Sequence, residues 1–173
     1  DNVLVNNGYL GMGEEVRLFE SEIENYLSCD SYKVVCVNSG TAALHLAIES
    51  VTNPGDEVLV PSYTYISTYQ AITAAGCVPI SCEIADSNLL IDLRDAESRI
   101  SPRTKVILPV WYASNPEILL EVYAFSRKHN LRVIEDAAHA FGCTFNGKKI
   151  GAQGDIICFS FDGIKNITSG EGG

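Results

Sequence analysis

Short apolar segments alternate along this chain with segments of helical spacing, and this alternation restricts the fold more than any other feature. Six apolar segments read as buried strands: residues 33–38, 57–61, 78–84, 104–110, 132–138 and 155–161. Strands that are apolar throughout and separated by helices are typical of a parallel sheet covered on both faces. We therefore expect an α/β fold of three layers (αβα) with a mostly parallel sheet.

Helices are expected between these strands, at residues 39–50, 64–76, 92–101 and 115–130. The last of them has the clearest end signals. Pro116 suits the first turn of a helix, and Glu117 favours its positive end. Lys128 and His129 favour the negative end, so we expect this helix to begin at about Pro116.

Charge and composition exclude several classes of partner. The net charge is −10 over 173 residues, which argues against nucleic acid because a nucleic-acid partner requires a basic face. No apolar run approaches the length of a membrane span, and the first residues do not resemble a signal peptide. The six cysteines form no CxxC pair or Cys/His cluster, so we expect buried free thiols, no metal site and a cytoplasmic protein.

The residues that directly follow each strand are the candidate functional residues, because ligands bind parallel sheets outside the carboxyl ends of the strands. Five such loops collect most of the unusual side chains: NSGTA (38–42), SYTY (62–65), VWYASN (110–115), EDAAHA (135–140) and SFDGIK (160–165).

The first loop has two interpretations. Ser39 and Thr41 are residue types that commonly cap helices, and a cap is the favoured interpretation of this loop alone. The same loop could hold a phosphate, because Gly40 allows close backbone approach. The N–H groups of Thr41 and Ala42 would then lie at the positive end of the helix.

Two later loops carry ionisable side chains. Asp136 ends a very apolar strand, where it could cap a helix, form a salt bridge or hold a proton on a ligand nitrogen. His139 could face the same cavity, although a lone histidine is more often structural. Most lysines are solvated, but Lys165 would lie near a buried carboxylate and a phosphate site. A partly desolvated amine there can form a Schiff base.

Together these groups are the parts that a pyridoxal 5′-phosphate (PLP) site needs: a phosphate site, an acid for the pyridine nitrogen and a Schiff-base lysine. Tyr65 could stack on the pyridine ring, and Ser160 could donate a hydrogen bond to the phosphate.

Four motifs resemble those of the DegT/DnrJ/EryC1/StrS family: NSGTAALHLA, PGDEVLVPSYTYISTYQAI, VIEDAAHAFG and FSFDGIKNITSGEGG. The members of this family are PLP-dependent aminotransferases that act on nucleotide-linked keto sugars, and the resemblance runs from about Gly8 to Gly173. It implies the large domain of aspartate-aminotransferase-like (fold type I) PLP enzymes. Residues 1–173 would be the N-terminal portion of that domain, with the small C-terminal domain absent. This piece alone is expected to be inactive or nearly so.

The resemblance also implies a role for each matching residue. Lys165 would be the catalytic lysine that forms the Schiff base, and Asp136 the acid paired with the pyridine nitrogen. The other positions would contact the cofactor: Gly40, Thr41, Ala42 and Ser160 at the phosphate, Tyr65 over the ring and His139 beside it.

The implied reaction transfers an amino group from an amino acid donor, usually L-glutamate, to the keto sugar, and the implied assembly is a homodimer. Relatives that act as sugar dehydratases have His in place of Lys165, so an aminotransferase is favoured. Asp162, Trp111 and Ser114 depart from residues common in the family, which affects the expected sugar more than the reaction type.

Two alternatives remain at this point. The first is a non-catalytic relative, either a pseudoenzyme or a regulator, which the retention of Lys165 and Asp136 disfavours. The second is a nucleotide-binding domain of another type, which is disfavoured because neither GxGxxG nor GxxxxGK[ST] follows the first predicted strand.

Overall fold

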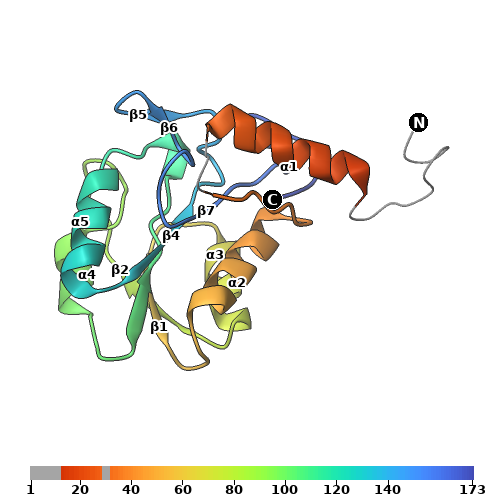
Figure 1. Ribbon diagram of the computed structural model, residues 1–173. Helices are drawn as coiled ribbons and strands as arrows, with labels where there is room; N and C mark the ends of the chain where they lie inside the picture. Colours follow the sequence, from red (N-terminus) through yellow and green to blue (C-terminus); the bar gives the residue numbers. More distant parts are fainter. Residues whose placement is uncertain (1–12, 29–31) are drawn as a thin grey trace.

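A computed structural model describes residues 13–28 and 32–173 of the chain (Figure 1). Its centre is a five-stranded parallel sheet with the strand order β2-β1-β3-β4-β7. The strands of this sheet are β1 (Glu57–Pro61), β2 (Val78–Cys82), β3 (Thr104–Ile107), β4 (Arg132–Asp136) and β7 (Ile156–Cys158). Two short strands that the sequence did not predict, β5 (Thr144–Phe145) and β6 (Lys148–Lys149), form a separate antiparallel hairpin.

Helices lie on both faces of the sheet (Figure 1). They are α1 (Glu14–Leu27), α2 (Gly40–Val51), α3 (Ile66–Ala74), α4 (Leu93–Ser98) and α5 (Leu119–His129). The predicted three-layer α/β fold with a mostly parallel sheet is therefore confirmed. The described helices include none with the length and apolar character that a membrane span requires.

The core divides into two layers, because side chains alternate between the two faces of each strand. On one face, Val58 of β1 and Ile134 of β4 pack with Ile48 of α2. On the other face, Leu59 of β1 and Val133 of β4 pack with Val122 of α5. Because of this alternation, successive residues of β4 face different helices, and the side chains of Glu135 and Asp136 lie on opposite faces of the sheet.

The helix α1 forms a smaller cluster of its own. Its residues Ile23 and Leu27 are four positions apart, so they lie on one face of the helix, and both are buried against Phe141 and Phe161. Our interpretation of the sequence did not identify this helix. It packs Phe161, and with it the segment that leads to Lys165, against the rest of the molecule.

One predicted strand is wrong, and one predicted helix is wrong at its start. Residues 33–38 form no strand: Val35 is 67% exposed, and Val37 exchanges backbone hydrogen bonds with Gly173 (2.9 and 3.1 Å) instead of joining the sheet. The helix predicted for residues 115–130 begins only at Leu119. Asn115, which precedes Pro116, is extended, as residues before proline usually are, so the helix begins after that turn.

All five described cysteines are free. Cys77, Cys82 and Cys158 are buried as predicted, whereas Cys36 and Cys143 are only half-buried. Cys29 lies outside the described residues.

A buried carboxylate fixes the start of β1. Glu57 is 3% exposed and accepts hydrogen bonds from the hydroxyls of Ser101 (2.5 Å) and Thr104 (3.1 Å). The Arg103 guanidinium also donates to it, from Nε at 3.0 Å. The hydrogen bond from Ser101 lowers the pKa of Glu57 most, burial opposes this effect, and Arg103 and Thr104 lower the pKa further.

We expect Glu57→Gln to reduce the free energy of unfolding by about 1–3 kcal/mol at pH 7, since three donors then face a neutral amide. The pKa of Glu57 is lower in the folded than in the unfolded chain, so its stabilisation is present above about pH 4.3. It is lost as the pH falls through the folded pKa. Urea unfolding at several pH values measures the stability difference between Glu57→Gln and the unaltered chain, with Glu83→Gln, at an exposed position, as the control. A stability difference that persists unchanged in acid would contradict the assigned role of the Glu57 charge.

Candidate active site

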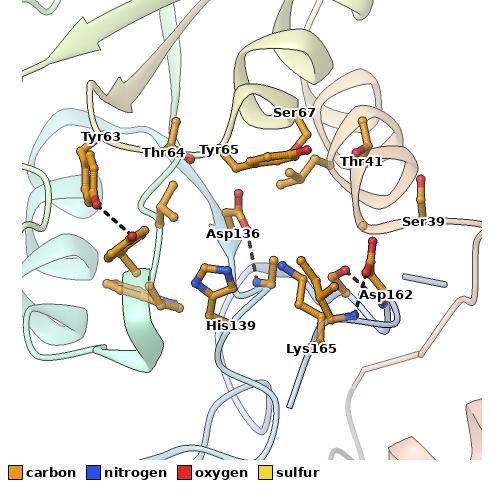
Figure 2. A pocket seen from close by; sticks show the side chains of 18 of the residues that line it. Ser39, Thr41, Tyr63, Thr64, Tyr65, Ser67, Asp136, His139, Asp162 and Lys165 are labelled. Carbon is orange, nitrogen blue, oxygen red and sulfur yellow. Dashed lines mark hydrogen bonds between the residues drawn. The ribbon is translucent and has the colours of Figure 1, made fainter. Parts of the chain in front are cut away.

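The five loops singled out above meet around one cavity, at the carboxyl ends of the strands (Figure 2). The cavity has a volume of about 400 Å³, within the range of small-molecule sites. Each loop contributes to its lining, through residues that include Ser39, Tyr65, Trp111, Asp136 and Lys165. Residues that are more than 100 positions apart in the sequence are thus neighbours in space.

The first loop forms the start of α2. Ser39 caps this helix, because its hydroxyl accepts the N–H of Ala42 at 3.1 Å, so the favoured interpretation of the loop is confirmed. Gly40 and Thr41 line the cavity, whereas Ala42 is not among its lining residues. A Cβ atom on Gly40 would lie 2.9 Å from the Cβ of Ser160, so the absence of a side chain lets the helix start approach Ser160.

Asp136 lies at the floor of the cavity, at the end of β4, and is 4% exposed. One carboxylate oxygen accepts the hydroxyl of Thr68 at 2.9 Å, and the other accepts the N–H of Ala138 at 3.2 Å. Burial raises the pKa of Asp136. The two hydrogen bonds and the nearby side chains of His139 and Lys165 act against this rise.

Thr68 is a site residue that our interpretation of the sequence missed. It lies in α3, is fully buried, and donates to Asp136, so its oxygen accepts the hydroxyl of Thr64 at 2.8 Å. The only signal in the sequence is a threonine on the apolar face of a predicted helix. That pattern does not reveal which carboxylate the hydroxyl meets.

We expect Thr68→Val to reduce the free energy of unfolding by about 1–3 kcal/mol, because a carboxylate oxygen and the Thr64 hydroxyl lose a buried partner. Thr73→Val is a matched control, since Thr73 lies in the same helix and is exposed. Chemical denaturation of both variants measures the difference. Equal losses in the two variants would mean that the Thr68 hydroxyl does not support Asp136.

Lys165 follows a tight turn that Asp162 organises. The backbone N–H of Lys165 donates to the carbonyl of Asp162 at 3.0 Å, and the N–H of Ile164 donates to its carboxylate at 2.9 Å. The Lys165 side chain is half-buried and lines the cavity. Asp162, which departs from the residues common in the resembled family, is thus the residue that closes this turn.

His139 lies on the same side of the cavity as Lys165 (Figure 2). Burial lowers the pKa of His139, the charge of Lys165 lowers it further, and Asp136 acts against both. Its ring lies 5.7 Å from the ring of Tyr112, whose hydroxyl accepts that of Tyr63 at 2.8 Å. A histidine with a lowered pKa is neutral at pH 7, so it can donate or accept a hydrogen bond without adding charge.

The two remaining predicted residues also line the cavity. Tyr65 is 74% exposed, and its ring lies across the cavity from Lys165 (Figure 2). Ser160 is 8% exposed and faces the start of α2. All predicted site residues except Ala42 therefore line one cavity.

The described residues fit the cofactor that the resemblance implies. A helix start pressed against Ser160 provides N–H and O–H donors for a phosphate. The buried carboxylate of Asp136 is suited to a protonated ring nitrogen, because a positive partner offsets the cost of its burial. Lys165 brings a primary amine into the same cavity.

Comparison with protein families matches residues 2–173 to the DegT/DnrJ/EryC1/StrS aminotransferase family. The chain is 41% identical over 163 residues to GDP-perosamine synthase of Caulobacter vibrioides, covering 94% of this chain and 43% of that protein. It is 40% identical over 164 residues to UDP-N-acetyl-3-dehydro-alpha-D-glucosamine 3-aminotransferase of Acidithiobacillus ferrooxidans, covering 94% of this chain and 44% of that protein. The chain thus spans less than half the length of these curated relatives.

Solved structures agree with the fold. Spr1654 of Streptococcus pneumoniae, solved in a PLP form and a PMP form, matches 99% of this chain with a TM-score of 0.91 and 30% identity. In its PLP form the match covers 47% of that chain.

Proposed function

Because the chain belongs to the DegT/DnrJ/EryC1/StrS aminotransferase family, we propose that it is part of an enzyme that transfers an amino group from L-glutamate to a nucleotide-linked keto sugar. Residues 1–173 are proposed to be the N-terminal portion of its cofactor-binding large domain. The observation that carries the proposal is that Lys165, Asp136 and the start of α2 line a single cavity. The cofactor is pyridoxal 5′-phosphate, as the family and the PLP and PMP forms of Spr1654 indicate.

When bound, pyridoxal phosphate supplies an aldehyde that carries the amino group and a pyridine ring that takes up negative charge. Lys165 would hold it covalently through its amine. Once the amine of the amino acid donor has displaced it from the cofactor, the freed Lys165 amine would take the proton from the α carbon of the donor. Asp136 would keep the ring nitrogen protonated, so that the ring can accept charge, and Thr68 orients the Asp136 carboxylate.

The other lining residues bind and orient. Thr41 and Ser160, with the backbone of Gly40, would hold the phosphate at the positive end of α2. Tyr65 would cover the ring, and His139 would lie beside it as a neutral imidazole. Ala42 acts only by completing the capped first turn, through its hydrogen bond to Ser39.

The substrate class rests on the names of the relatives. One name specifies a GDP-linked amino sugar as the product, and the other specifies a UDP-linked keto sugar as the substrate. We propose a substrate of the same kind, a homodimeric assembly and a cytoplasmic location. Two exposed residues of the cavity lining, Tyr65 (74%) and Ile164 (88%), and the exposed Ile66 (59%) that follows Tyr65 in the chain are the apolar surface that a second copy would cover.

An amino-transfer assay tests the proposed function. The protein that carries this chain is incubated with PLP, L-glutamate and a GDP-linked or UDP-linked keto sugar, with Lys165→Ala as the control. We expect 2-oxoglutarate and an aminated nucleotide sugar, identified by mass. PLP binding without amino transfer to either sugar would favour the non-catalytic relative instead.

A further inference from the structure

Glu135 is a buried carboxylate that the proposed chemistry does not use. It precedes Asp136 in β4, so its side chain faces the opposite side of the sheet, toward α5. It is only 1% exposed, and burial raises its pKa, while hydrogen bonds from Tyr123 and Trp111 act against this rise. An acid in such a place is costly, and an apolar residue of similar size would fill the space more cheaply.

Both carboxylate oxygens of Glu135 accept a hydrogen bond from a neutral donor. The indole Nε1–H of Trp111 donates to Oε2 at 2.7 Å, and the hydroxyl of Tyr123 donates to Oε1 at 2.6 Å. The Tyr123 oxygen in turn accepts the N–H of Asp155 at 2.8 Å. Every polar atom of this network therefore has a partner, and the acceptor at its centre is Glu135.

Trp111 connects this network to the cavity. Its side chain is 1% exposed, packs in the core on the α5 side of the sheet, and is also part of the cavity lining. The indole has a single N–H and no acceptor, so the bond to Glu135 selects one orientation of the ring.

The loop that follows Trp111 has a strained backbone. Ala113 (φ 49°) and Ser114 (φ 65°) both occupy the left-handed region, which residues with a side chain rarely adopt. The same loop contacts two walls of the cavity: the hydroxyl of Tyr112 accepts that of Tyr63, and the hydroxyl of Ser114 donates to the carbonyl of His139. A strained loop keeps such a conformation only where its surroundings hold it.

We propose that Glu135 is a positioning residue for the cavity: it anchors the Trp111 indole and thereby holds residues 111–115 in the conformation that places Tyr112 and His139 at the cavity wall. This proposal extends the function proposed above. It depends on one part of that function, the binding of PLP in the cavity. The geometry of the indole can be tested without any ligand.

The chain contains one tryptophan, so indole signals report on Trp111 alone. Glu135→Met removes both acceptor oxygens at similar length. We expect this variant to retain the far-UV circular dichroism of the folded chain, while its Trp111 emission shifts and quenching by acrylamide increases several-fold. Tyr123→Phe is the matched control: it removes the other hydrogen bond to the same carboxylate and should leave Trp111 emission unchanged.

A second measurement needs no variant. In the unaltered chain the single indole N–H resonance is expected far downfield and slow to exchange with solvent, as for a buried N–H bonded to a carboxylate. A rapidly exchanging indole N–H would overturn the proposal. So would Trp111 emission that is identical in Glu135→Met and the unaltered chain, or that changes equally in Tyr123→Phe, because Glu135 would then only stabilise the core.

PLP titration separates this proposal from the proposed function. We expect the unaltered chain to bind PLP and Glu135→Met to bind it several-fold more weakly, with Tyr123→Phe close to the unaltered chain. If the unaltered chain does not bind PLP, the proposed function fails, while the indole measurements still decide the role of Glu135. Equal PLP affinity of the unaltered chain and Glu135→Met would overturn the positioning role.

Discussion

Replacement of Lys165 by alanine is expected to abolish covalent attachment of PLP and to slow amino transfer by at least about 10²–10⁴-fold, the range for loss of a general acid–base group. Lys165 is the one lysine among the cavity-lining residues. The fold should survive, because its half-buried side chain belongs to no ion pair among the residues described. The rate of conversion of L-glutamate to 2-oxoglutarate in the protein that carries this chain measures the loss.

Lys148→Ala is the matched control for this experiment. Lys148 is exposed, lies in the β5–β6 hairpin and contacts Gln153, away from the cavity. It should keep both covalent attachment and activity. A Lys165→Ala variant that retains the activity of the unaltered protein would show that another group performs the proton transfer.

Replacement of Asp136 by asparagine is expected to have opposite effects on activity and on stability. Activity should fall by about 10²–10⁴-fold, because an amide cannot keep the ring nitrogen protonated. The cofactor-free chain should be at least as stable as the unaltered one at pH 7, since a buried amide costs less than a buried carboxylate. The carbonyl oxygen of the new side chain can still accept the N–H of Ala138, as the carboxylate does now. Its NH₂ group can donate to the Thr68 oxygen if the Thr68 hydroxyl, which now donates to the carboxylate, donates to Thr64 instead.

The stability difference between Asp136→Asn and the unaltered chain should depend on pH in a defined direction. Burial raises the pKa of Asp136 in the folded chain above the ordinary value of about 3.9. The folded chain therefore holds the proton more tightly than the unfolded chain, and its stability falls as the pH rises from about 4 through the folded pKa. Below about pH 4 both states are protonated and the difference should disappear.

Urea unfolding of the cofactor-free chains between pH 3 and pH 8 measures this difference. A variant that is less stable than the unaltered chain at pH 7 and equally stable in acid would mean that the folded pKa is lowered instead. That result would point to a fixed ion pair with Lys165.

The sheet could be predicted from the sequence because buried parallel strands leave a strong local pattern. Segments such as Glu57–Pro61 and Arg132–Asp136 are apolar runs bounded by turn residues, and both form strands. Residues 33–38 have the same pattern and no strand, since an apolar run does not specify a neighbour with which to pair. The start of α5 was predicted too early, because Pro116 suits a turn before a helix as well as its first turn.

Part of the candidate site could be predicted from the rule that ligands bind at the carboxyl ends of parallel strands. Residues that follow parallel strands share one edge of the sheet, so Thr41, Asp136 and Lys165 were expected together, and they line one cavity. For Thr41 the premise was wrong, because residues 33–38 form no strand, and the start of α2 brings Thr41 to the cavity. The partners Thr68 and Glu135 could not be found in this way. Their hydrogen bonds depend on how α3 and the loop after β3 pack onto β4, which leaves no signal in a single sequence.

The most direct test of the proposed function is to locate PLP on the chain. Purified protein is mixed with PLP, its visible absorption is recorded before and after borohydride reduction, and the modified peptide is identified by mass. We expect an absorption band that reduction removes, and a single modified peptide that contains Lys165. Modification spread over exposed lysines such as Lys105 and Lys148, or no modification at all, would contradict the assignment of the cavity as a PLP site.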